Sequence, residues 1–190
     1  TTQMISAYER LGSLSLMSKD TKLATTYFSE GFDLAKKIQS THYQNFLKTR
    51  LAKAHYDNGD VKKAETILTE VLENTRNKGD IGMFIDAVSI LAAIYYDIKE
   101  YKKSVQTLND GIEVSIKNDL KLFLMGFYNR QASNFIQMNQ LDKAEYYLQK
   151  IENLQDFTEK NVLLSLYINR KKVDSARGNY LGALEWNNKY

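Results

Sequence analysis

The chain has 190 residues, of which 43% are hydrophobic, and its formal net charge of +3 is the balance of 26 basic and 23 acidic residues. This much apolar sequence is enough for a buried core, and the nearly balanced charge argues against direct nucleic-acid binding, which needs a concentrated positive field. Because the chain has no cysteine, disulfide frameworks, thiolate metal sites and cysteine nucleophiles are excluded.

Apolar residues recur at spacings of three and four along the chain, which is typical of amphipathic helices, and proline is absent. Two breaks in this pattern, Asn58-Gly59-Asp60 and Asn77-Lys78-Gly79-Asp80, combine a glycine that ends one helix with an aspartate that caps the next. The sequence therefore predicts an all-α fold of ten helices, at about 3–17, 21–38, 42–57, 61–77, 81–97, 101–117, 120–138, 141–153, 158–176 and 180–190.

Small residues recur with a period of forty. The first series advances in steps of 40, 40, 40 and 39 and consists of Ala24, Ala64, Ser104, Ala144 and Ala183. A second series lies twelve residues before the first four of these and consists of Gly12, Ala52, Ala92 and Ala132. Because two helices approach closely only where side chains are small, each pair predicts two facing helices within one repeat.

The residues around these small positions resemble the tetratricopeptide repeat family, whose signature is W-x2-L-G-x2-Y, then A-x3-F, then P. The matching residues are Tyr8, Leu11, Gly12, Ala24 and Phe28 in the first repeat and Val88, Leu91, Ala92, Tyr95, Ser104 and Leu108 in the third. The chain departs from the family because its period is 40 instead of about 34 and because the closing proline is missing. Each helix should therefore be longer than the family norm by almost one turn.

The resemblance implies one array over residues 1–190, with repeats at about 3–40, 41–79, 80–118, 119–156 and 157–190. The expected architecture is a right-handed α-α superhelix of about five antiparallel helix pairs, the last one incomplete. The fifth repeat is irregular: a basic residue holds its first small position, and a one-residue deletion leaves the register open between Lys171 and Lys172. Tyr180 falls in a repeating packing position of this repeat.

The sequence offers little that could support catalysis. His42 and His55 are its two imidazoles, and no metalloprotease, nucleophile-elbow, phosphate-loop or dinucleotide motif occurs. His55 occupies the packing position that Tyr95 and Phe135 fill in later repeats, so we expect a structural role for it, and His42 is expected at the surface. The interpretation is that the protein is not an enzyme and holds no cofactor and no metal.

In the tetratricopeptide architecture the first helix of each pair lines the concave surface, so its inward-facing side chains are the candidate ligand-binding residues. Besides Arg10, the set predicted for this face is Arg50, Lys53, Tyr56, Tyr96, Asn129, Arg130, Asn169 and Lys172. Asparagine can bond to a peptide backbone, arginine can bind a carboxylate with two hydrogen bonds, and tyrosine offers flat apolar contact. An extended peptide with a carboxylate would suit this chemistry, and the alternative is that each residue is an ordinary exposed polar residue. The clamp of tetratricopeptide cochaperones is not expected, because Glu9 and Ser13 stand at its lysine and asparagine positions.

Forty-residue repeats of this kind are similar to the extracytoplasmic sensor arrays of bacterial membrane-bound regulators. We therefore expect a non-enzymatic module that binds a protein or peptide, as the sensor or interaction part of a larger bacterial signalling or transcription-regulator protein. Two alternatives stay open: a cytoplasmic receptor for short signalling peptides, and an assembly scaffold that forms homo-oligomers through its terminal repeat. No apolar run approaches the roughly 18 residues of a membrane span and no secretory leader is visible. The compartment is left open, with the extracytoplasmic side favoured.

Overall fold

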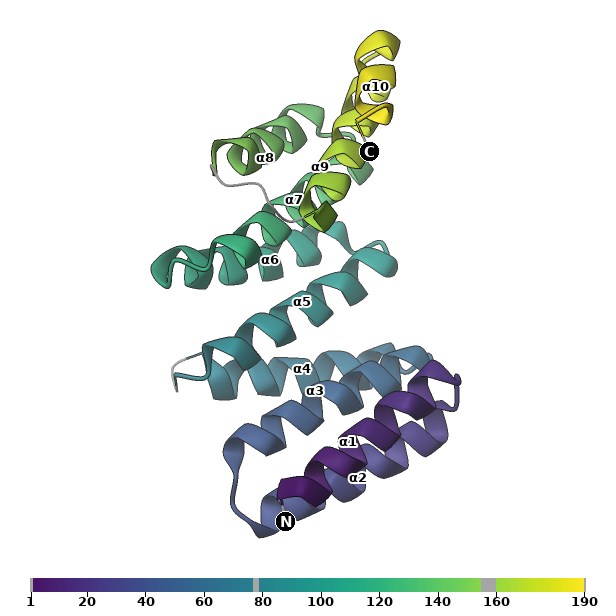
Figure 1. Ribbon diagram of the computed structural model, residues 1–190, viewed down its shortest axis with the longest axis vertical. Coiled ribbons are helices and arrows are strands. Elements are labelled where there is room, and N and C mark those ends of the chain that lie inside the picture. Colours follow the sequence, from purple (N-terminus) through teal and green to yellow (C-terminus); the bar gives the residue numbers. More distant parts are fainter. Residues whose placement is uncertain (1, 77–78, 155–159, 190) are drawn as a thin grey trace. The chain divides into compact units, whose positions relative to one another are not determined.

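The computed structural model describes residues 2–76, 79–154 and 160–189, which form α-helices and no strand (Figure 1). The ten helices in this described part are α1 (Thr2–Met17), α2 (Thr21–Lys37), α3 (Thr41–Asp57), α4 (Val61–Thr75), α5 (Ile81–Asp97), α6 (Tyr101–Lys117), α7 (Lys121–Gln137), α8 (Leu141–Asn153), α9 (Lys160–Ala176) and α10 (Tyr180–Asn187). The predicted all-α class and its five successive helix pairs are confirmed. The predicted helix ends at 77, 158 and 190 lie outside the described residues.

The turns between helices repeat one geometry at intervals of twenty residues. After α1, the N–H of Lys19 donates to the carbonyl of Leu16 at 3.0 Å and the N–H of Asp20 donates to the carbonyl of Ser15 at 2.8 Å. These two bonds define the Schellman motif, which requires a left-handed residue. Such residues have φ between 50° and 86°. Those spaced by twenty residues are Lys19, Gln39, Gly59, Gly79, Lys99, Asp119 and Asn139, and Gly178 follows 39 residues after Asn139. The forty-residue period is therefore two equal halves, each made of one helix and one turn.

Short polar side chains cap several helix N-termini. The carboxylate of Asp20 accepts from the N–H of Leu23 at 2.9 Å, and that of Asp60 accepts from the N–H of Lys63 at 3.2 Å. The predicted break at Asn58-Gly59-Asp60 is thus confirmed. In the second predicted break, Asn77 and Lys78 lie outside the described residues, and Asp80 accepts from the N–H of Met83 at 3.3 Å.

The chain divides into two compact units, Thr1–Ile94 and Tyr95–Tyr190. In the first unit α1 packs on α2, α2 on α3 and α3 on α4. Its core contains Ile5, Ala24, Phe28, Ala35, Leu47 and Ala54. In the second unit α7 packs on α6, α8 and α9, and α9 packs on α8 and α10. Its core contains Leu124, Met125, Tyr128, Ala132, Phe135, Ala144, Leu148, Ile151, Leu166 and Val173.

The small residues of the sequence repeat are buried, as predicted. A Cβ atom added to Gly12 of α1 would lie 2.5 Å from the ring of Phe28 in α2. No side chain larger than hydrogen fits there without displacing the ring, so this glycine sets how closely the first pair packs. The remaining members of both series are also buried: Ala24, Ala52, Ala64, Ala92, Ser104, Ala132, Ala144 and Ala183.

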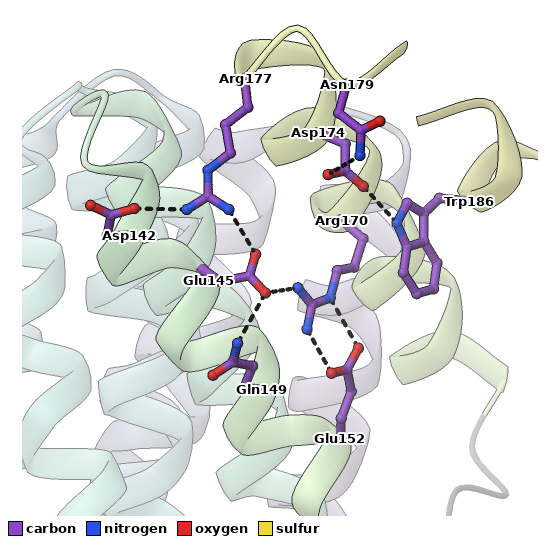
Figure 2. A network of polar contacts seen from close by, with 9 residues as sticks. All are labelled: Asp142, Glu145, Gln149, Glu152, Arg170, Asp174, Arg177, Asn179 and Trp186. Atoms are coloured by element: carbon purple, nitrogen blue, oxygen red, sulfur yellow. Dashed lines mark hydrogen bonds and ion pairs between the residues drawn. The ribbon is translucent and has the colours of Figure 1, made fainter. Parts of the chain in front are cut away.

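A polar network fixes α9 against α8, as Figure 2 shows. The guanidinium of Arg170 donates from Nε and Nη2 to the carboxylate of Glu152 at 2.9 and 2.6 Å, and its Nη1 pairs with Glu145. Two turns further on, just beyond the end of α9, Nη2 of Arg177 lies 2.7 Å from Oδ1 of Asp142. Because Arg170 is buried and bonded on both sides, its side chain holds α9 in a fixed rotation on α8.

The contacts of Lys171 and Lys172 show the register of the fifth helix pair. Nζ of Lys171 donates to Oδ1 of Asn187 in α10 at 2.6 Å, whereas Lys172 is exposed. Lys171 therefore faces the partner helix and holds the position twelve residues before Ala183. The indole Nε1 of Trp186 donates to Asp174 at 2.8 Å and joins the same two helices (Figure 2).

The expectation that Tyr180 packs in the core is wrong, because 74% of this residue is exposed. At the corresponding position of α6, the ring of Tyr101 packs edge-on against that of Tyr96, with 5.5 Å between the ring centroids. The residue five places before Tyr180 is Ser175, which offers no ring. Within the described part of the chain, none of the helices is long and apolar enough to cross a membrane.

Candidate functional site

A hollow of about 420 Å³ lies between α7 and α9 in the second unit. Its walls are Gly126, Asn129, Arg130, Ser133, Asn161, Val162, Ser165, Ile168, Asn169 and Lys172. Four of the predicted ligand-binding residues are among them: Asn129, Arg130, Asn169 and Lys172. Both helices are the first of their pairs, so the hollow lies on the helices that sequence reasoning assigned to ligand binding.

An asparagine pair forms the centre of this hollow. Nδ2 of Asn169 donates to Oδ1 of Asn129 at 2.6 Å and to the Asn129 carbonyl at 3.2 Å, and it lies 3.0 Å from Oγ of Ser133. Asn169 is buried and Asn129 is half-buried. Since Oδ1 of Asn129 accepts from Asn169, its Nδ2 keeps two N–H donors with no partner among the described residues, and these can bind a ligand.

The hollow is positively charged. Arg130 and Lys172 contribute two cations, and no acidic residue is among the described residues that form its walls. The surrounding atoms keep water from the Arg130 guanidinium and thereby lower its pKa, while the charge of Asp97 acts in the opposite direction. The outer surface of the Arg130 and Lys172 side chains stays exposed. The arrangement favours a ligand with a negative group.

Tyr96 belongs to the same unit but does not line the hollow. It lies in the last turn of α5, beside Tyr101 of α6. Burial raises the pKa of its hydroxyl, and a hydrogen bond with Gln137 acts in the opposite direction. Its ring and hydroxyl are thus engaged with neighbouring helices.

The other three predicted residues, Arg50, Lys53 and Tyr56, lie on α3 in the first unit. Nε of Arg50 lies 3.4 Å from a carboxylate oxygen of Glu9, and its guanidinium lies 4.9 Å from the centroid of the Phe46 ring. Lys53 forms an ion pair with Asp57, and its Nζ lies 5.5 Å from the centroid of the Tyr56 ring. Arg50 and Lys53 each lie beside a carboxylate, and none of these three residues is in the walls of the α7–α9 hollow.

A second hollow of about 420 Å³ lies between α1 and α3 in the first unit. Its walls are Thr2, Gln3, Ser6, Ala7, Arg10 and Tyr43. Arg10 is the one residue of this group that sequence reasoning placed on the binding face. The smaller hollow beside it, of about 270 Å³, includes the carboxylate-bearing Glu9, so this region does not have the purely positive lining of the α7–α9 hollow.

Sequence reasoning missed six residues of the α7–α9 hollow. Ser133 and Ser165 lie one helical turn from Asn129 and Asn169, so stepping by four residues from the predicted asparagines would have found them. The same stepping reaches Asn161, while Val162 and Ile168 carry no sign of a ligand-binding role. Gly126 is identifiable only as a glycine inside a helix.

Neither histidine lies in an arrangement that suggests catalysis. Nδ1 of His42 lies 2.8 Å from Oδ2 of Asp80, and the His42 side chain is 61% exposed, as expected for a surface residue. His55 is half-buried, and burial followed by the charge of Lys63 lowers its pKa. The described residues contain no cluster of three or more side chains that could hold a metal ion.

Comparison with known proteins agrees with the helix-pair architecture. Residues 2–119 match the model of the tetratricopeptide repeat-like domain. No curated protein sequence matches the chain significantly. The solved structure of a putative kinesin light chain with nearly identical TPR-like repeats from Podosopora anserina has a TM-score of 0.79 at 15% identity, covering 97% of this chain and 92% of that chain.

Two further solved structures are similar. BtubC from P. vanneervenii has a TM-score of 0.83 at 15% identity, over 96% of this chain and 76% of that chain. A Rap protein complexed with Competence and Sporulation Factor has a TM-score of 0.75 at 12% identity, over 96% of this chain and 52% of that chain. At these identities the likeness shows the fold alone. The family model, however, covers more than half of the chain, and the chain therefore belongs to the tetratricopeptide repeat-like domain family.

Proposed function

We propose that this chain is a non-enzymatic binding module that holds an extended protein or peptide segment with a carboxylate in the hollow between α7 and α9. The observation that carries the proposal is the composition of this hollow, which combines two cations and a half-buried asparagine amide with no acidic residue among its described walls. Arg130 and Lys172 supply positive charge for the carboxylate, and Nδ2 of Asn129 can donate to a backbone carbonyl of the ligand.

The hollow is also held rigidly enough for recognition. Asn169 fixes the rotamer of Asn129 through the 2.6 Å bond, and the neighbouring Arg170 anchors α9 to α8 on an adjacent face of the helix. Side chains that are ordered before a ligand arrives lose less conformational entropy on binding. This supports a preformed binding site over a generally polar surface.

The protein context belongs to the same proposal. A Rap protein of similar fold is complexed with Competence and Sporulation Factor, and the forty-residue period is similar to that of bacterial sensor arrays. We propose that the chain is the input part of a larger bacterial signalling or transcription-regulator protein. A cytoplasmic receptor for short signalling peptides is the nearest alternative, and it would use the same hollow.

The test is calorimetry against a library of extended hexapeptides, each with one aspartate or, in a matched copy, asparagine. We expect the aspartate peptides to bind more tightly, and we expect Lys172→Glu and Asn129→Ala each to weaken that binding at least tenfold. Lys102→Glu makes the same charge change at an exposed lysine of α6 outside the hollow and serves as the matched control. Equal binding of aspartate and asparagine peptides, or unchanged binding in both hollow variants, would reject the proposed site.

A second candidate function is assembly through the terminal repeat. The observation in its favour is the exposed apolar surface of α10, where Tyr180, Leu181 and Leu184 are 74%, 79% and 56% exposed. Self-association would bury these side chains. Light scattering over a hundredfold concentration range should then show oligomers that Leu181→Lys dissociates, whereas a monomer throughout the range would exclude this function.

A further inference from the structure

Gly126 lies in the interior of α7, and close packing does not explain why this residue is a glycine. A Cβ atom added there would meet no other atom within 4 Å. By contrast, a Cβ on Gly12 would lie 2.5 Å from the ring of Phe28, and a Cβ on Gly31 would lie 3.2 Å from Tyr8. Glycine weakens a helix interior, and the fold explains its presence at Gly12 and Gly31 by close packing. At Gly126 the protein's own packing does not require it.

What Gly126 does provide is open space at the wall of the α7–α9 hollow. The absence of a side chain leaves the α7 backbone bare at this point, and glycine is the residue that lets another molecule approach a backbone closely. Val162 and Ile168 of α9 add apolar surface to the same hollow. This part of the hollow is therefore shaped for apolar contact, although its other walls are amides and cations.

Large apolar side chains continue this surface along α7. Leu122 and Phe123 precede Gly126 by four and three residues, which places them on the same side of the helix, and both are exposed. Apolar side chains of this size are normally buried unless a partner covers them. Leu122 and Phe123 thus lie one turn before Gly126 on α7, next to the residues that form the walls of the hollow.

The positive end of the hollow is close by. Arg130 follows Gly126 by four residues, which corresponds to one helical turn, or about 6 Å along the axis. Lys172 of α9 adds a second cation, with no described acidic residue in the walls. A ligand group that rests on Gly126 is therefore about 6 Å, or nearly two residue lengths of an extended peptide, from an anion-binding pair.

We propose that Gly126 forms the floor of an apolar subsite, on which a bulky, preferably aromatic, side chain of the ligand packs while a carboxylate about 6 Å away pairs with Arg130 and Lys172. The inference rests on the proposed function and specifies its ligand. The ligand is a peptide segment in which a residue such as phenylalanine carries a free C-terminal carboxylate or is followed directly by an acidic residue. Both sources present an aromatic ring and a carboxylate, and the carboxylate is further from the ring in the second.

The experiment uses acetylated hexapeptides that differ in one group at a time. Two end in phenylalanine or alanine with a free carboxylate, a third ends in phenylalanine amide, and a fourth is amidated and contains an internal phenylalanine followed by aspartate. The protein variant is Gly126→Leu, which keeps a good helix former but fills the open space. The matched control is Gly82→Leu, because a Cβ on Gly82 of α5 also meets nothing within 4 Å and Gly82 lies outside the hollow.

By calorimetry, we expect the free-carboxylate phenylalanine peptide to bind at least tenfold more tightly than its alanine and amide counterparts. Gly126→Leu should weaken the binding of this peptide at least tenfold, whereas Gly82→Leu should leave its affinity unchanged. Tighter binding of the internal phenylalanine-aspartate peptide would assign the carboxylate to a side chain, and tighter binding of the first peptide would assign it to a C-terminus. If Gly126→Leu does not give a folded protein by circular dichroism, Gly126→Ala serves in its place, with an expected loss of about threefold.

Two outcomes separate this inference from the proposed function. The apolar subsite is rejected if the phenylalanine and alanine peptides bind with equal affinity. It is also rejected if Gly126→Leu binds both peptides with wild-type affinity while Lys172→Glu binds both more weakly. In either case the carboxylate site stands. If Lys172→Glu changes no peptide's affinity, or if no peptide binds, the proposed function fails and the subsite fails with it.

Discussion

Asn169 and Asn129 are forty residues apart in the sequence, and their side-chain amides share a hydrogen bond of 2.6 Å. They occupy the same position in successive repeats, on the first helix of each pair. The corresponding residue two repeats before Asn129 is Thr49, whose hydroxyl bonds instead to the Asn45 carbonyl of its own helix at 2.9 Å. The Thr49 hydroxyl also lies 3.8 Å from Sδ of Met83 in α5, so this position joins successive first helices through a weak sulfur contact in the first unit and through an amide pair in the second.

Replacement of Asn169 by alanine should destabilise the protein and weaken peptide binding together. The variant removes the bonds of a buried amide to Asn129 and Ser133, which we expect to cost about 1–2 kcal/mol of unfolding free energy. Urea denaturation followed by circular dichroism measures this loss. Asn161→Ala, at an exposed position of the same hollow, should change stability by less than about 0.5 kcal/mol. Equal effects of the two variants would contradict the role assigned to the pair.

The left-handed turns predict opposite effects of two exchanges. Lys99 has φ of 65° and Gly59 has φ of 86°, and a side chain in this region costs about 1–2 kcal/mol relative to glycine. Lys99→Gly should therefore stabilise the protein by about 1 kcal/mol, and Gly59→Ala should destabilise it by a similar amount. Thermal unfolding of both variants tests the sign, and a lower melting temperature for Lys99→Gly would contradict the turn geometry.

Two helical glycines should respond in opposite ways to the same substitution. Gly12→Ala drives a methyl group to 2.5 Å from the Phe28 ring, and overpacking of this kind costs about 1–3 kcal/mol. Gly126→Ala meets no atom within 4 Å and removes a weak helix former, so it should gain about 0.5–1 kcal/mol. Chemical denaturation of the two variants under one condition provides the comparison. A loss of stability in Gly126→Ala would mean that the fold itself needs this glycine.

His55 should make stability depend on pH. Burial lowers its pKa in the folded protein, with a further contribution from Lys63 and opposition from Asp60, so the unfolded chain binds the proton more readily. The stabilising effect of the neutral side chain is complete above the ordinary histidine pKa of about 6.5. It is lost as the pH falls from there toward the lower folded pKa.

The check is urea denaturation at pH 8 and at pH 6, above the range in which most carboxylates titrate. Wild type should be less stable at pH 6, and His55→Phe, which installs the residue type found at Phe135, should reduce that difference. His42→Gln provides the control for the exposed histidine. A pH effect that survives His55→Phe unchanged would contradict its assignment to His55.

The helices and turns could be predicted from the sequence because their determinants are local. Apolar spacing, glycine and capping aspartate lie within a few residues of the boundary they set, as at Gly59 and Asp60. The buried small positions could also be predicted, because small residues recur at the same place in successive repeats. Gln131 shows the limit of this approach: it is fully buried in a position that holds leucine in earlier repeats, and its amide donates to Asn109 at 2.8 Å and to the Val105 carbonyl at 3.1 Å.

The candidate site could be predicted only in part, because exposure and charge on a helix face do not reveal a side chain's partner. Arg50 was expected to bind a ligand, yet it lies beside Glu9, which is 41 positions away on another helix. Asn129 and Asn169 both lie in the walls of the α7–α9 hollow, but the bond between them depends on the distance between α7 and α9. Gly126 was missed because it contributes to the hollow by lacking a side chain, whereas sequence patterns predict a binding site from the side chains that are present.

The even spacing of the turns also has a consequence for how such chains can be rebuilt. Left-handed residues stand at Lys19, Gln39, Gly59, Gly79, Lys99, Asp119 and Asn139, each twenty residues after the last. Gene crossovers placed at any two of these turns would exchange whole helices and keep the twenty-residue spacing of the turns. Crossovers at Asp119 and Gly178, in the turns before α7 and after α9, would carry the α7–α9 hollow and its ligand specificity into another array.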